Sequence, residues 1–224
     1  MKKIARRTLV GQACSGLLVS AISRDVKAYA DTFKMPATPK EAMTILTQGN
    51  GRFQAKQLTS LQEDLQILRT NTVEEQKPFA AILSCADSRV PVELVFDQTI
   101  GHLFVVRVAG NLATPATIAS LEYGAAVLGV KVMLVIGHRN CGAVKATMGA
   151  KPVPGQISSL YQYIHPALKT GEMDVNLASR ENAKYQTELL RASSPVLASL
   201  IKEGKMSLHA TYYDVETGKV EVLT

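Results

Sequence analysis

Two short polar clusters in this chain supply residue types that bind metal ions. The first is Cys85-Ala-Asp87-Ser-Arg89, and the second runs from His138 to Cys141. Two thiolates and one imidazole are a ligand set of catalytic zinc, which keeps a fourth position for water or substrate. Asp87 and Arg89 lie two and four residues past the first thiolate, close enough to act on whatever fills that position. The spacing therefore predicts a catalytic metal site.

Each cluster follows the end of an apolar run. The runs 77–84 and 130–137 are short and lack polar alternation, which is typical of buried strands in a parallel sheet. A third run, 103–108, has the same character and is expected to lie beside them. Residues 114–129 begin with Thr-Pro and end with Gly, the start and stop signals of a helix. This strand, helix, strand unit predicts a parallel sheet with helices on its faces.

Such a sheet brings the candidate ligands together. Ligands of parallel sheets gather at the carboxyl ends of the strands, and Cys85 and His138 both follow a predicted strand. Cys141 precedes a predicted helix, 142–148, whose dipole favours a thiolate. His138 and Cys141 are therefore expected to chelate from one turn.

The remaining segments fit the same fold class. Residues 40–53 form an amphipathic helical pattern, 158–202 are mainly helical, and 207–223 alternate like a hairpin that turns at 216–218. The sequence predicts an α/β fold with a mostly parallel central sheet flanked by helices. It contains no GxGxxG turn and no Walker loop, so the pattern does not indicate a nucleotide-binding enzyme.

The first 30 residues have the organisation of a signal peptide. Basic residues precede a mildly apolar stretch that ends at Ala28-Tyr-Ala30. The adjacent Arg6 and Arg7 favour twin-arginine export, while the Sec route stays open. The apolar stretch is too short and polar for a stable membrane anchor. We therefore expect residues 1–30 to be removed, leaving 31–224 as a single catalytic domain in the periplasm or an equivalent extracytoplasmic compartment.

Removal of the signal peptide changes the charge of the chain. The whole sequence carries a formal net charge of +6, but residues 31–224 hold 19 basic and 18 acidic residues. A nearly neutral domain does not indicate a nucleic-acid partner.

The cysteine count leaves one alternative for the site. Cys14 lies in the predicted signal peptide, so only Cys85 and Cys141 remain. In an exported protein these two could form a disulfide. A disulfide explains neither His138 at chelating distance nor the charged pair beside Cys85.

The combined motifs resemble those of the β-class carbonic anhydrases. Cys-x-Asp-x-Arg is followed some fifty residues later by His-x-x-Cys, and three further stretches match in order. These stretches are Gly49-Asn-Gly-Arg-Phe53, Phe104-Val-Val-Arg-Val-Ala-Gly-Asn111 and Gly137-His-Arg-Asn-Cys-Gly142. The resemblance extends from about Pro39 to the C-terminus.

The resemblance implies a role for each residue of the two clusters. Cys85, His138 and Cys141 would bind one Zn²⁺ per chain, and Asp87 and Arg89 would form the catalytic dyad. In a closed state Asp87 would itself become the fourth metal ligand. The implied reaction is the reversible hydration of carbon dioxide to bicarbonate and a proton.

The resemblance also implies a substrate pocket completed by a partner subunit. By spacing, Gln76, Phe104 and Tyr123 match pocket residues that lie at a dimer interface in the family. The helical segment 40–53 would also embrace a partner subunit, as the N-terminal helices do in the family. A homodimer or a larger even oligomer is therefore expected. Two alternatives stay open: hydrolysis of carbonyl sulfide or carbon disulfide on the same scaffold, and a non-catalytic protein that binds zinc or uses its thiols in redox chemistry.

Overall fold

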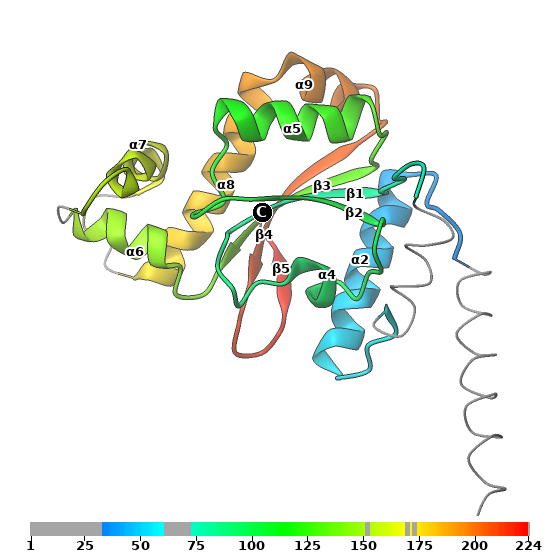
Figure 1. Cartoon of the computed structure of the whole chain (residues 1–224), viewed down its shortest axis with the longest axis horizontal. Coiled ribbons are helices and arrows are strands. Elements are labelled where there is room, and N and C mark those ends of the chain that lie inside the picture. Colours follow the sequence, from blue (N-terminus) through cyan, green and yellow to red (C-terminus); the bar gives the residue numbers. More distant parts are fainter. Residues whose placement is uncertain (1–32, 61–72, 151–152, 169–170, 172–173, 224) are drawn as a thin grey trace, which may run out of the picture. The chain divides into compact units, whose positions relative to one another are not determined.

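The computed structural model describes residues 33–60, 73–150, 153–168, 171 and 174–223 (Figure 1). The predicted signal peptide lies outside these residues. Residues 35–224 form one compact unit. Within the described part of the chain, none of the helices has the length and apolar character needed to cross a membrane.

Five strands form one sheet in the described part of the chain. They are β1 (Ala80–Ser84), β2 (Leu103–Arg107), β3 (Val132–His138), β4 (Ser207–Tyr213) and β5 (Val220–Val222). The order is β2-β1-β3-β4-β5, and only β5 runs antiparallel to its neighbour. The predicted mostly parallel sheet is confirmed. The C-terminal hairpin is also present, but its first strand, β4, additionally extends the parallel sheet by pairing with β3.

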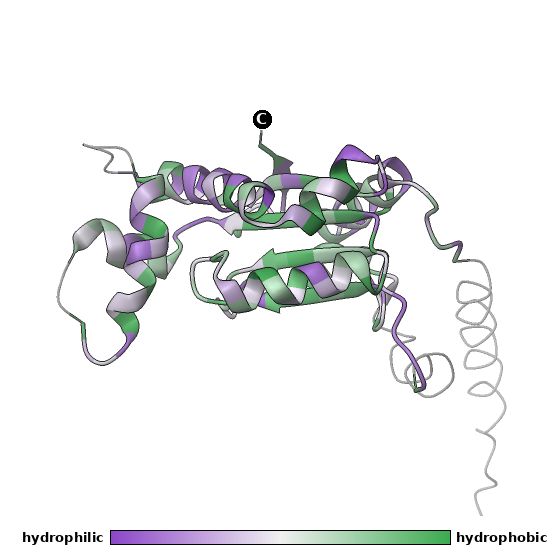
Figure 2. Ribbon diagram, turned by 90° about the horizontal axis from the view of Figure 1, so that it is seen from above, coloured by the Kyte–Doolittle hydropathy of each residue, from purple (hydrophilic) through white to green (hydrophobic). Residues whose placement is uncertain are grey.

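The central strands are continuously apolar because both of their faces are covered. Every residue of β1 and β3 is buried, and Figure 2 shows hydrophobic residues concentrated on the strands. Alternate residues such as Leu83 and Val135 pack against Leu121, Leu190 and Leu197 on one face. Complete burial removes the need for polar alternation.

The helices are defined by the signals seen in the sequence. They are α2 (Pro39–Gln54), α4 (Val92–Val95), α5 (Pro115–Ala126), α6 (Gly142–Gly149), α7 (Tyr161–Ile164), α8 (Val175–Ser193) and α9 (Pro195–Lys202), with 3₁₀ turns η2 (Ile157–Leu160) and η3 (His165–Ala167). Thr114 caps α5 through a capping box and Pro115 follows at its first position, as predicted. Asp174 caps α8 by accepting hydrogen bonds from the Asn176 and Leu177 amides.

The helices form a layer on each face of the sheet. Figure 1 shows α5 and α9 together on one side of the strands, with α2 and α4 on the other. Because α5 connects two parallel strands, the β2, α5, β3 segment is the predicted crossover unit. This arrangement leaves the carboxyl ends of β1 and β3 side by side.

The Gly-Asn-Gly-Arg-Phe stretch joins α2 to the rest of the fold. The Asn50 side chain donates to the carbonyls of Val95 at 3.1 Å and Gly218 at 2.8 Å. Arg52 pairs with the buried Asp97. These bonds connect α2 with α4 and with the β4–β5 turn, so this stretch has a structural role.

Candidate metal centre

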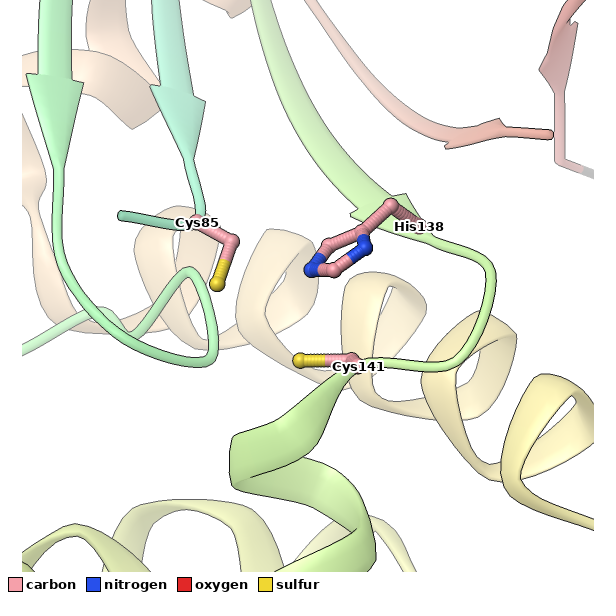
Figure 3. A group of neighbouring side chains, drawn as sticks. All are labelled: Cys85, His138 and Cys141. Atoms are coloured by element: carbon pink, nitrogen blue, oxygen red, sulfur yellow. The ribbon is translucent and has the colours of Figure 1, made fainter. Parts of the chain in front are cut away.

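Three residues from two adjacent strands and one helix converge at the carboxyl edge of the sheet. Cys85 directly follows β1, His138 ends β3, and Cys141 is the N-cap residue of α6. Their side chains point toward one another (Figure 3), and their ligand atoms all lie within 4.8 Å of each other. All three are buried. The residues form a Cys–His–Cys cluster that can hold a metal ion.

The imidazole is oriented as a metal ligand requires. His138 Nδ1 lies 3.1 Å from the Arg139 carbonyl, which accepts a hydrogen bond when Nδ1 carries the proton. The Nε2 atom is buried and has no hydrogen-bond partner among the described residues. Buried polar atoms are normally paired, and an imidazole held through one nitrogen commonly binds metal through the other. The donor set and this nitrogen therefore fit a metal ion.

The two thiols interact so that Cys85 carries a negative charge and Cys141 keeps its proton. Cys85 and Cys141 are free thiols, so the alternative disulfide is not formed in this structure. The pKa of Cys85 is lowered to about 4, chiefly because the Cys141 thiol hydrogen-bonds to its sulfur. The same interaction, together with burial, raises the pKa of Cys141. The Gly110 amide also donates to Cys85 Sγ at 3.3 Å.

Asp87 and Arg89 form a close ion pair next to the cluster. Arg89 Nε donates to Asp87 Oδ1 at 2.9 Å, and Arg89 Nη2 donates to Oδ2 at 2.7 Å. This pairing lowers the pKa of Asp87 to about 2, against the opposing effect of burial. Asp87 Oδ2 lies 3.9 Å from His138 Nε2. The carboxylate is therefore ionised and adjacent to the candidate metal position.

Arg107 is a residue of the site that no motif in the sequence indicated. Its Nε donates to the Cys85 carbonyl at 3.0 Å, and its Nη2 donates to the Asp87 carbonyl at 2.6 Å. Both bonds hold the backbone that carries one ligand and the dyad aspartate. The only signal in the sequence was a cation at the end of the otherwise apolar run 103–108.

The structure does not bring the three predicted pocket residues to the cluster of the same chain. Phe104 pairs with Ala81 near the start of β1, four residues before Cys85, a separation of about 13 Å along a strand. Its ring lies 6.2 Å from that of Tyr123 on α5. Gln76 is exposed and precedes β1 by four residues, at the opposite end of the strand from Cys85.

The fold and the site define a class, an α/β protein with a candidate metal centre at the carboxyl edge of a parallel sheet. A family model described as carbonic anhydrase matches residues 80–220. A carbonic anhydrase of Mycolicibacterium smegmatis is 32% identical over 194 residues, covering 83% of this chain and 94% of the relative. Carbonic anhydrase 2 of Mycobacterium tuberculosis is also 32% identical, covering 83% and 93%.

Solved structures agree with these relatives. The structure of the β-carbonic anhydrase CcaA is similar to this chain with a TM-score of 0.60 and 26% identity, covering 71% of this chain and 91% of that chain. This chain therefore belongs to the carbonic anhydrase family, in its β class. The resemblance drawn from the motifs is confirmed at this level.

Proposed function

We propose that this chain is a zinc enzyme that catalyses the reversible hydration of carbon dioxide to bicarbonate and a proton. The observation that carries the proposal is the ionised Asp87, held by Arg89 through two hydrogen bonds beside three buried metal-ligand atoms. The relatives at 32% identity that are named carbonic anhydrases support the same reaction.

Cys85, His138 and Cys141 would hold one Zn²⁺ per chain. Two thiols and an imidazole suit zinc, and such a site keeps a fourth position for water or substrate. When bound, zinc supplies a nucleophile at neutral pH by lowering the pKa of water from 15.7 to about 7.

The dyad would orient the attacking water. A carboxylate that accepts a hydrogen bond from this water directs the remaining oxygen lone pair toward carbon. Arg89 keeps Asp87 ionised and restricts its rotation through a charge-assisted bidentate bond. Arg107 holds the backbone of the same residue. The aspartate is thus held at both its side chain and its main chain.

A second copy of the chain would complete the substrate pocket. Phe104, Tyr123 and Gln76 lie away from the cluster of their own chain, so in this proposal they would serve the cluster of a partner. In the described part of the chain β2 pairs only with β1. Next to it, Tyr123 is 48% exposed and Val127 is 65% exposed. This apolar face of β2 and α5 suits burial against another subunit.

In that dimer the three pocket residues would have two different roles. Phe104 and Tyr123 would provide an apolar wall for a nonpolar gas. Gln76 would donate a hydrogen bond to a substrate oxygen as charge develops there. A Val127→Glu variant, which places a charge on this face, should lower both the dimer fraction in sedimentation experiments and the activity.

The protein is further proposed to be exported by the twin-arginine route into the periplasm or an equivalent compartment. The support is the basic stretch with Arg6 and Arg7 followed by the apolar segment and Ala28-Tyr-Ala30. Changing both arginines to lysine preserves the charge and should retain folded enzyme in the cytoplasm. Undiminished export of this variant would assign export to the Sec route.

The reaction is tested by stopped-flow hydration of carbon dioxide, with zinc content measured on the same sample. Wild type should contain about one zinc per chain and be active. Asp87→Asn should keep zinc and lose most of the activity. Carbonyl sulfide and carbon disulfide are tested in parallel. Turnover of either without hydration of carbon dioxide would replace the proposed substrate, and a zinc-free, inactive protein would contradict the enzyme assignment.

A further inference from the structure

Asn176, in the first turn of α8, contacts the turn that connects two of the candidate metal ligands. Its Oδ1 accepts a hydrogen bond from the Asn140 backbone amide at 3.0 Å. The same oxygen lies 3.3 Å from the Tyr212 hydroxyl, which donates to it. Asn140 lies between His138 and Cys141. Helix α8 is therefore connected to the ligand turn through one side-chain oxygen.

The Asn140 backbone is in turn connected to the dyad. Its φ is +51°, in the left-handed region, where asparagine is enriched among the residues other than glycine. Its carbonyl accepts a hydrogen bond from Arg89 Nη2 at 3.2 Å. This nitrogen is the one that also donates to Asp87 Oδ2 at 2.7 Å. The Asn140 carbonyl therefore helps to set the direction of the guanidinium group.

The acceptor oxygen of Asn176 is itself held on two sides. The Asn176 backbone amide donates to the capping side chain of Asp174 at 2.7 Å. Tyr212 lies on β4, where the Arg180 guanidinium stacks over its ring at 4.0 Å. Helix α8 and the sheet together fix the position of the oxygen. The Asn176 oxygen can therefore stabilise the left-handed backbone of Asn140 through the amide hydrogen bond that it accepts.

We infer that Asn176 is a positioning residue for the catalytic dyad, acting through the Asn140 backbone on Arg89 and through Arg89 on Asp87. This inference rests on the proposed function and extends it to a residue outside both sequence motifs. The Arg89 side chain is 47% exposed, so its orientation depends on the few partners that hold it. Without Asn176 the ligand turn loses a bond to α8, and the guanidinium loses a fixed acceptor.

The expected effect concerns turnover rather than metal or substrate binding. The hydrogen bonds of Asn176 go to Asn140, Asp174 and Tyr212, none of which is a candidate ligand or a predicted pocket residue. Asn176→Ala should lower kcat about tenfold, the lower range for residues that orient a metal site from outside. KM and the zinc content should stay close to wild type.

Two matched variants distinguish this positioning role from a general loss of folding or stability. Asn176→Asp keeps an acceptor oxygen at the same position and should recover most of kcat. Leu177→Ala changes an exposed neighbour in the same helical turn and should leave kcat unchanged. Thermal unfolding is recorded for all three variants. If Asn176→Asp is as slow as Asn176→Ala, or Leu177→Ala is equally slow, the inference is wrong.

A double-mutant cycle with Arg89→Ala tests whether Asn176 affects kcat through Arg89. If Asn176 acts through Arg89, Asn176→Ala should lower kcat little further when Arg89 is absent. Fully multiplicative losses would show that the two residues act independently and would overturn the inference. The absorption spectrum of cobalt-substituted protein gives a readout besides activity. Asn176→Ala should shift it in the same direction as Arg89→Ala, whereas Asn176→Asp should not.

Two different experimental outcomes distinguish an error in the proposed function from an error in the role of Asn176. A zinc-loaded wild type without carbon dioxide hydration would overturn the proposed function, and with it the role of Asn176. An active wild type with an equally active Asn176→Ala would overturn the role of Asn176 alone.

Discussion

Arg89 binds both carboxylate oxygens of Asp87, at 2.9 and 2.7 Å, while Asp87 Oδ2 remains 3.9 Å from His138 Nε2. The carboxylate therefore lies close enough to the ligand cluster to reach a metal ion, and its lone pairs are directed to the guanidinium instead. In the proposed enzyme, two uses of Asp87 would therefore compete: orienting water and becoming the fourth metal ligand. Arg89 would favour the first use, because its bidentate charge-assisted bond holds the carboxylate away from the ligand cluster.

Removing the guanidinium should release the carboxylate to the metal. In Arg89→Ala the pKa of Asp87 should rise toward its ordinary value, and the freed side chain should close the fourth position. We expect kcat to fall at least about tenfold with zinc still bound. X-ray absorption spectroscopy would count the ligands. An open fourth position with a wild-type rate would show that Arg89 does not control the choice.

Replacing one thiol should remove the metal. Cys141→Ser lacks a sulfur ligand and is expected to lose most of its zinc and its activity. Because metal bound to the folded state stabilises it, the melting temperature of the zinc-loaded sample should fall toward that of chelator-treated wild type. Zinc analysis and calorimetry check both statements. Full zinc occupancy with a normal rate would remove Cys141 from the ligand set.

Two glycines of α2 offer a matched pair for testing how this helix docks. A Cβ at Gly49 would lie 1.8 Å from the Phe96 carbonyl oxygen, whereas one at Gly51 would meet nothing within 4 Å. Gly49→Ala should therefore lower the free energy of unfolding by more than about 2 kcal/mol, because the added methyl group overpacks the contact with Phe96. Gly51→Ala should stabilise the helix by up to about 1 kcal/mol. Urea unfolding of both variants gives the comparison, and equal stabilities would mean that α2 is not packed this closely.

The buried Asp97 should make stability depend on pH. Burial alone would raise the pKa of its carboxyl, but the Arg52 guanidinium and hydrogen bonds from Ser60 and Thr59 outweigh it, so the pKa lies below its ordinary value. A lowered pKa contributes stability that is complete above the unfolded value of about 3.9 and is lost as the pH falls below it.

Asp97→Asn should remove that contribution. The variant should be about 2 kcal/mol less stable than wild type at neutral pH, because charged hydrogen bonds are lost. The difference should stay constant above about pH 5 and shrink as the pH falls below about 4. Denaturant unfolding at several pH values measures it. A difference that does not change with pH would assign the effect to packing.

Local patterns in the sequence were sufficient to predict the fold class and the candidate metal ligands. Each ligand stands next to a strand end or a helix start, and these boundaries follow from short-range signals such as the apolar run before Cys85 or the Thr114-Pro115 helix start. Adjacent parallel strands end at the same edge of the sheet, so Cys85 and His138 were expected to meet.

Only the tertiary structure showed what holds that site in place. Arg107 and Asn140 each form a hydrogen bond with a residue of the dyad, and Asn176 forms one with Asn140; all three bonds join segments far apart in the chain. Such bonds leave no periodic pattern in the sequence, because they depend on how loops and helices pack around the sheet. The separation of Phe104 from Cys85 likewise follows from strand register, which arises only when β1 and β2 pair.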